Sequence, residues 1–211
     1  MKLSAIVTCH ESDPNPVVRM LKAQTVPPYE ILLETSGECT PLIETVDYHQ
    51  HVHNENDFGY RKRNRLALRA TGEWIGFFCH DDSYHPRYIE MMMERGQGRE
   101  VVYCEWNDHP DCNFEACQST LGNFFINRDT FMAMGGFSIA EEVGFTDALL
   151  IETLREMRVH LARLNVVLYY HNVPYDNNIV PTTWGELKGN VRGEYQEWVK
   201  LTELQMRVNM P

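Results

Sequence analysis

Two adjacent carboxylates, Asp81 and Asp82, follow an apolar run from Trp74 to Phe78 in the stretch GEWIGFFCHDDSYHP. A short apolar run that ends abruptly in polar residues is typical of a buried strand. Carboxylates suit a hard divalent cation, which shares the rest of its coordination shell with water or phosphate. Asp81 and Asp82 are therefore candidate metal ligands. The alternative is that they are surface acids at the end of a strand.

Polar side chains also follow the other predicted strands. These candidates are Thr8, His10 and Glu11 after the first strand, Glu34 and Thr35 after the second, and His171 after the last. Such a rim suits a metal that holds a phosphate, and an arginine would neutralise the remaining phosphate charge. A basic helix over 60–72 supplies the arginines, but they cannot all face one way. The candidates on this helix are Arg61, Arg63 and Asn64, and at most one or two of the arginines serve the site.

The elements that position these residues alternate along the chain. Strands are predicted over 2–10, 29–34, 73–82, 99–108 and 160–172, and helices over 15–25, 60–72, 86–96 and 145–157. The segment 41–53 predicts a weak helix or turn and then a short strand, and 121–137 a strand leading into a short helix. This alternation indicates an α/β domain with a mostly parallel sheet, in which ligands bind outside the carboxyl ends of the strands.

Composition limits the class of protein. The 211 residues are 43% hydrophobic, which is enough for one domain with a hydrophobic core. We expect 173–211 to be a docked arm or a link to further domains. A net charge of −11 argues against a nucleic-acid or anionic-membrane partner. The six cysteines form no zinc-type CxxC pair, and we expect neither a signal peptide nor a membrane span. The expectation is a soluble, cytoplasmic protein of open oligomeric state.

Several motifs in one order resemble the GT-A nucleotide-sugar glycosyltransferases, most closely family 2, over residues 3 to about 172. The resemblance is carried by LSAIVTCHES, LKAQTVPPYEILLETSGE, RNRLALRATGEWIGFFCHDDSYHPRYIE, GNFFINRDTFMAMGGF and FTDALLIETLREMRVHLARLNVVLYYH. It implies a GT-A α/β fold, with a central, mostly parallel mixed sheet flanked by helices. The chain is also similar in character to the amino-terminal glycosyltransferase domain of a chlorella virus protein that builds capsid glycan, which would place it in a host cytoplasm.

The resemblance also implies an activity. The chain would be an enzyme that moves a hexosyl or deoxyhexosyl group from a UDP-sugar to a hydroxyl of a glycan acceptor, with Mn²⁺ or Mg²⁺ bridging the diphosphate. Asp81 matches the metal ligand of the family's Asp-x-Asp motif, whose first acid is replaced here by Cys79. Asp82 stands next to it, and His171 matches a histidine that completes the metal shell or contacts phosphate. Asp147 matches the acid that deprotonates the acceptor.

The residues that we expect to bind the donor are Thr8, His10, Glu11, Glu34, Thr35, Arg63, Asn64 and Asp81. Of these, Arg63, Asn64 and Asp81 match the family's spacing. The family's second strand usually ends in an aspartate that contacts uracil or ribose. Here that strand ends in Glu34-Thr35-Ser36, so recognition of the base must be built differently.

Simpler interpretations stand beside these. Asp147 could only favour the helix dipole, His171 could be an ordinary strand-end histidine, Arg63 could face solvent and Asn64 could bond locally. His49, His51 and His53 share one strand face and fit an exposed edge strand better than a zinc site. The spacing of Cys112 and Cys117 is a weak metal or disulfide signal, and packing of the arm explains Trp184, Tyr195 and Trp198 better than sugar stacking does.

Two other functions remain open. A catalytically inactive GT-A-like binding domain would explain the cysteine at position 79. A nucleotidyltransferase would also use metal-binding carboxylates, but TCHESDPNP contains no Gly-rich phosphate loop after the first strand.

Overall fold

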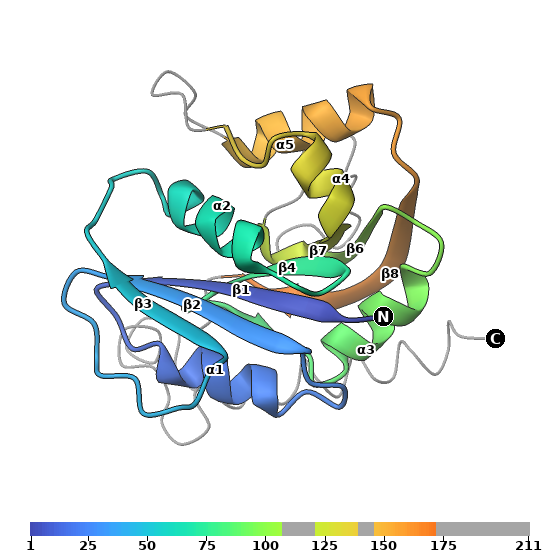
Figure 1. The fold of residues 1–211 in the computed structure, drawn as a ribbon. Coiled ribbons are helices and arrows are strands. Elements are labelled where there is room, and N and C mark those ends of the chain that lie inside the picture. The colour runs from blue at the N-terminus through green and yellow to red at the C-terminus, as the bar shows by residue number, and fades with distance from the viewer. Residues whose placement is uncertain (107–120, 139–145, 172–211) are drawn as a thin grey trace.

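The computed structural model describes residues 1–106, 121–138 and 146–171, and for 146–148 it describes only the backbone (Figure 1). The predicted arm at 173–211, with Trp184, Tyr195 and Trp198, lies outside the described residues. The same holds for Cys112 and Cys117.

The first half of the chain is a run of alternating strands and helices. Its elements are β1 (Leu3–His10), α1 (Asn15–Lys22), β2 (Glu30–Ser36), β3 (Tyr48–Val52), α2 (Tyr60–Arg69) and β4 (Trp74–Cys79). The strands pair in parallel, with β2 and β4 on either side of β1 and β3 beyond β2. Strand β1 is buried from Leu3 to Cys9, as its continuous apolar sequence predicts for a central parallel strand.

The second half completes a mixed sheet. Its elements are β5 (Ser83–Tyr84), α3 (Tyr88–Arg95), β6 (Val101–Trp106), the 3₁₀ turn η2 (Leu121–Asn123), β7 (Phe124–Asn127), α4 (Arg128–Ala133), α5 (Thr146–Glu156) and β8 (Leu161–Tyr170). Over the described residues one eight-stranded sheet has the order β3-β2-β1-β4-β7-β6-β8-β5. Strand β7 runs antiparallel to both β4 and β6, and the short β5 runs antiparallel to β8. The α/β class and the mixed sheet are confirmed.

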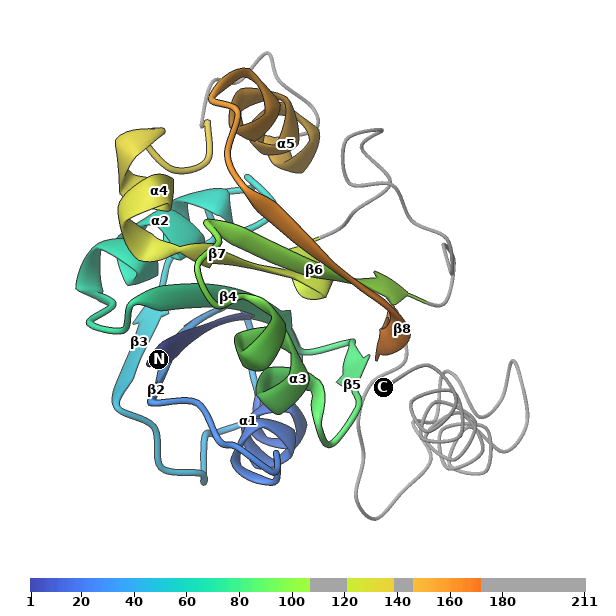
Figure 2. The same cartoon turned by 90° about the vertical axis from the view of Figure 1, so that its right-hand side faces the viewer.

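Helices cover both faces of this sheet. Figures 1 and 2 show α1 and α3 on one face, and α2, α4 and α5 on the other. Aromatic side chains fill much of the space between the layers, and Phe78, Tyr84 and Tyr88 form one group with ring centroids 4.9–6.2 Å apart. These buried rings pack β4, β5 and α3 against one another, and they hold the carboxyl end of β4 in place.

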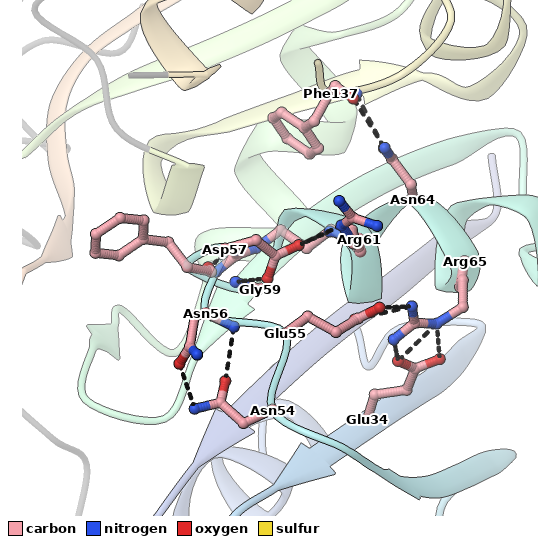
Figure 3. A network of polar contacts seen from close by, with 12 residues as sticks. Glu34, Asn54, Glu55, Asn56, Asp57, Gly59, Arg61, Asn64, Arg65 and Phe137 are labelled. Carbon is pink, nitrogen blue, oxygen red and sulfur yellow. Dashed lines mark hydrogen bonds and ion pairs between the residues drawn. The ribbon is translucent and has the colours of Figure 1, made fainter. Parts of the chain in front are cut away.

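Asn64 on α2 joins the two halves of the domain. Its Nδ2 donates to the Phe137 carbonyl at 2.8 Å, and the Phe137 amide donates to Asn64 Oδ1 at 2.9 Å (Figure 3). Gly136, with φ +75°, precedes Phe137, and a Cβ there would lie 2.6 Å from Asn64 Oδ1. The Gly-Gly-Phe turn therefore needs glycine both for its backbone angle and for its approach to α2.

We predict that Asn64→Ala lowers the free energy of unfolding by about 1–3 kcal/mol, because it leaves the amide and the carbonyl of Phe137 without their side-chain partner. Urea denaturation measures this loss. Leu68→Ala, on the same helix at a side chain that is 69% exposed, is the control and should change stability much less. Equal losses in the two variants would contradict a specific role of Asn64.

Candidate functional site

A pocket of about 490 Å³ opens at the carboxyl ends of β1 and β4. It is lined by Thr8, Cys9, His10, Asn54, Asn56, Phe58, Gly59, Lys62, Arg63, Cys79, His80 and Asp81. Strand β1 is the point from which the sheet extends in both directions, to β2 and to β4. Ligands of open α/β sheets bind at such a switch point. The pocket therefore lies where the sequence predicted the site.

The loop from Asn54 to Gly59 forms one wall and leads into α2. The Asp57 carboxylate accepts hydrogen bonds from the Gly59 amide at 3.0 Å and from the Arg61 amide at 2.7 Å, which satisfies free donors at the helix N-terminus (Figure 3). Gly59 has φ +81°, and a Cβ there would lie 3.2 Å from Arg63 Nη1. Glycine at position 59 thus lets the backbone pass close to the arginine.

Two cations on α2 are buried beside the pocket. Lys62 is 3% exposed and Arg63 is 5% exposed. Lys62 Nζ donates to Ser36 Oγ, whereas Arg63 donates from Nη1 to the Phe58 carbonyl at 2.6 Å and from Nη2 to Cys79 Sγ at 3.5 Å. Burial lowers the pKa of Lys62, and the Asp57 carboxylate opposes that shift.

Among the residues that the structure describes, neither Lys62 nor Arg63 forms an ion pair with a carboxylate. Buried charges are normally paired. Two buried cations held only by neutral groups in one cavity therefore favour an anionic ligand, and the planar guanidinium of Arg63 suits phosphate oxygens.

An acidic group faces these cations at the end of β4. The ligand atoms of Cys79, Asp81 and Asp82 lie within 4.8 Å of one another. Within the described parts of the chain, the Asp81 carboxylate makes no hydrogen bond and no ion pair, so both of its oxygens are free to bind. Burial raises the pKa of the Cys79 thiol to about 12, while Arg63 opposes the shift. Asp81 and its neighbours fit a divalent cation through hard oxygen ligands.

Asp82 is buried and its two oxygens contact the end of β8. Tyr169 Oη donates to Asp82 Oδ2 at 3.0 Å, and His171 Nδ1 lies 3.0 Å from Asp82 Oδ1 and 2.6 Å from Tyr169 Oη. Burial and then the Asp82 charge raise the pKa of Tyr169 well above its usual value, so the hydroxyl keeps its proton. A carboxylate that holds Nδ1 fixes the orientation of a histidine ring. Asp82 therefore positions His171, and both remain predicted metal ligands.

The other predicted donor residues divide into two groups. Thr8 and His10 line the pocket, and His10 Nδ1 lies 3.1 Å from both the Ser36 carbonyl and Ser36 Oγ. Glu11 is exposed next to His10 and has φ +47°. These three residues stay predictions as donor contacts.

Glu34 and Thr35 lie outside the pocket lining. Glu34 is 1% exposed and accepts from Arg65 Nη2 at 2.7 Å, and Arg65 also pairs with Glu55 (Figure 3). Thr35 Oγ1 lies 3.1 Å from ring nitrogens of both His49 and His51. A donor contact by either residue would have to coexist with these bonds. Asn64 also lies outside the pocket lining, and its side-chain amide is hydrogen-bonded to Phe137.

The histidines at 49, 51 and 53 lie on or just beyond β3, which is an edge strand of the sheet, and all three are exposed. The prediction of an exposed edge strand is therefore confirmed. The predicted base, Asp147, lies in the first turn of α5, and its side chain is outside the described residues.

Sequence reasoning missed Lys62 and the loop residues Asn54, Asn56 and Phe58. A signal for Lys62 was present, because Lys62 and Arg63 stand four residues before Leu66 and Ala67. Residues at this spacing share a helix face. The apolar face of α2 therefore points both cations inward. No comparable periodic signal exists for the loop.

Comparison with known proteins adds information on the fold. No protein-family model matches the sequence, and no curated protein matches it. Solved structures of S. aureus TarS do match: one with a TM-score of 0.65 at 13% identity covers 82% of this chain and 37% of that one.

Two further matches are TarS 1–349 in complex with UDP, at a TM-score of 0.63 and 14% identity, and with UDP-GlcNAc, at 0.60 and 14%. The first covers 82% of this chain and 61% of that one, and the second 81% and 58%. The fold is therefore GT-A, and the chain spans less than two thirds of each of these structures. No helix in the described ranges is long and apolar enough to cross a membrane.

We predict that Tyr169→Phe lowers the free energy of unfolding by about 1–2 kcal/mol, because the buried Asp82 carboxylate loses one of its donors. Urea denaturation measures the change. Tyr29→Phe, at a ring that is 51% exposed, removes the same atom and should change stability little. If Tyr169→Phe is as stable as the parent protein, the hydroxyl does not support Asp82.

Proposed function

We propose that the protein is a metal-dependent glycosyltransferase that moves a hexosyl or deoxyhexosyl group from a UDP-sugar to a hydroxyl of a glycan acceptor. The observation that carries this proposal is the charge arrangement of the pocket. Among the described residues, Lys62 and Arg63 are buried without a carboxylate partner, and the Asp81 carboxylate that faces them makes no hydrogen bond or ion pair. A diphosphate with a divalent cation complements both signs of charge. TarS, which shares the fold, has been solved with UDP and with UDP-GlcNAc, and this supports the same class of ligand.

Different residues of the pocket would bind the diphosphate, the metal ion and the nucleoside of the donor. Lys62 and Arg63 would bind the diphosphate oxygens. Asp81 and Asp82, whose ligand atoms lie within 4.8 Å of each other, would hold Mn²⁺ or Mg²⁺, with His171, which Asp82 orients, as a further ligand. Bound there, the cation would supply positive charge to the leaving diphosphate. Thr8, His10 and Glu11 at the end of β1 would bind the nucleoside, with Glu34 and Thr35 behind them.

The chemical step needs stabilisation of the leaving group and removal of a proton. As the anomeric C–O bond to the diphosphate breaks, negative charge grows on the UDP oxygens, where the fixed charges of Lys62 and Arg63 stabilise it. The acceptor oxygen forms the new bond to the anomeric carbon, and the Asp147 carboxylate takes its proton.

The identity of the acceptor and the cellular compartment are also part of this proposal. A viral capsid glycan as acceptor, and action in a host cytoplasm, follow only from the resemblance described above.

One observation favours a second candidate, a GT-A-like domain that binds nucleotide without turnover. The thiol of Cys79 stands where the resemblance expects an acid, and its raised pKa keeps it neutral at pH 7. Turnover separates the two candidates, because both of them bind UDP.

We predict that UDP binds with Mn²⁺ at least tenfold more tightly than without it, and that Asp81→Asn removes this gain, as titration calorimetry would show. Lys62→Met should weaken UDP about 10- to 100-fold, because charge-assisted hydrogen bonds to phosphate are lost. It should leave uridine, which has no phosphate, unaffected.

The matched control is Arg61→Ala, which removes one positive charge from the same helix outside the pocket lining. It should change UDP affinity much less than Lys62→Met. Equal UDP binding with and without Mn²⁺ would contradict the metal role of Asp81. Absence of UDP binding under both conditions would contradict the proposed function.

We predict that Asp147→Asn lowers turnover about 10²- to 10⁴-fold and leaves UDP affinity unchanged, because an amide cannot accept the acceptor's proton. UDP release from a panel of UDP-sugars, with a glycan array as acceptor, measures turnover. Glu152→Gln, at an exposed acid on the same helix, is the control. Full turnover in Asp147→Asn would contradict the role of this aspartate as the base. Its remaining role would be a favourable interaction with the dipole of α5.

A further inference from the structure

Phe58 is an unusual part of the pocket wall. Its side chain is 84% exposed although phenylalanine is among the residues most often buried, and yet it lines the cavity. The other large exposed apolar side chains, such as Ile43 and Leu68, do not line this pocket. An exposed aromatic ring at the mouth of a cavity is a surface that a ligand can cover.

The backbone of Phe58 is strained in a way that favours a functional role. Its φ is +54°, between Asn56 at +52° and Gly59 at +81°. Positive φ is rare for bulky side chains, and such strain persists only where surrounding contacts impose it.

Here the imposing contacts are visible. Arg63 Nη1 donates to the Phe58 carbonyl at 2.6 Å, and Asp57 accepts from the next amide in the chain, that of Gly59, at 3.0 Å. Both bonds hold the peptide unit that joins Phe58 to Gly59, directly after the Phe58 side chain.

The same bonds set the place of the ring relative to the phosphate site. One guanidinium, that of Arg63, joins the Phe58 carbonyl and the Cys79 sulfur at the end of β4. The Phe58 backbone therefore contacts the Arg63 guanidinium, which is a group predicted to bind the diphosphate. The group covalently next to a diphosphate in a nucleotide is its nucleoside.

The other side chains on this side of the pocket suit a heterocyclic base. Asn54 and Asn56 present amides that donate and accept hydrogen bonds, and their mutual bond of 3.0 Å keeps both at the rim. Asn54 Nδ2 also lies 3.4 Å from Nε2 of His10. Aromatic rings that stack on bases, beside polar groups that reach their edges, are a common way to bind nucleotides.

We propose that the ring of Phe58 stacks on the pyrimidine base of the donor nucleotide, with Asn54 and Asn56 at the edge of the base. This inference rests on the proposed function and names the residue that recognises the base. It also explains how base recognition is built in a chain whose second strand ends in Glu34-Thr35-Ser36, with Glu34 already bound by Arg65.

The test compares a ligand that carries the base with one that lacks it. Titration calorimetry with UDP and with pyrophosphate, both with Mn²⁺, is carried out on the parent chain and on Phe58→Ala. Loss of one stacked base should weaken UDP about 5- to 100-fold and leave pyrophosphate unchanged. Leu68→Ala, which removes an exposed apolar side chain from the adjacent helix, is the control and should change neither affinity.

A second variant separates stacking from folding. Phe58→Gly removes the ring and tolerates positive φ, so it should unfold at no lower urea concentration than the parent while losing the same UDP affinity. Phe58→Trp should keep UDP affinity, and UDP should quench its fluorescence more than that of the parent chain, which has four tryptophans.

Each outcome of these titrations either supports or overturns base stacking by Phe58. Selective loss of UDP affinity in both the alanine and the glycine variant supports base stacking. Equal loss of UDP and pyrophosphate, or no loss of either, overturns it while leaving the proposed function standing. Normal UDP affinity with a weaker glycan acceptor would assign Phe58 to the acceptor instead. If the parent chain binds neither ligand, the proposed function fails, and this inference fails with it.

Discussion

Helix α2 can pack on the sheet only by burying positive charge, and the pocket follows from that constraint. Its inward face contains Leu66 and Ala67, and one turn earlier the same face contains Lys62 and Arg63. Burying an unpaired charge is costly, and the described residues offer these two cations only hydroxyl, carbonyl and thiol partners. The packing of α2 therefore places two positive charges at the pocket, which is where the proposed diphosphate would bind.

Helix α2 also fixes the position of the pocket relative to the rest of the domain. Asn64 binds the turn at Phe137, and Arg65 binds Glu34 at the end of β2 (Figure 3). The pocket residues lie between these two anchors. A displacement of α2 would break bonds to both halves of the sheet, and this coupling holds Lys62 and Arg63 at a fixed distance from the end of β4.

The sequence predicted the elements well because their signals are local. The apolar runs around Ile6 and Phe77 mark strands, and the strand ends correctly indicate where the pocket opens. Side-chain partners across the fold were harder to predict, because they depend on tertiary contacts. Nothing local shows that Glu34 meets Arg65, thirty-one residues later, or that Asp82 meets His171. Phe58 was missed because its importance lies in a positive φ and in exposure, neither of which leaves a periodic pattern.

The charges of the pocket have a consequence for how ligands enter it. Lys62 and Arg63 face Asp81, while Asp82 is engaged by Tyr169 and His171 and the thiol of Cys79 is neutral. Hydrogen bonding does not cancel the charge of a carboxylate, so the two cations of α2 face two carboxylates, Asp81 and Asp82, at the end of β4. A divalent cation entering alone is attracted by these carboxylates and repelled by the two side-chain cations, and the opposite holds for an anion. In the proposed function, a diphosphate bound beside Lys62 and Arg63 would offset the repulsion between these cations and a metal ion held by Asp81. Nucleotide and metal would then favour each other's binding through one electrostatic coupling, which by linkage is equal in both directions.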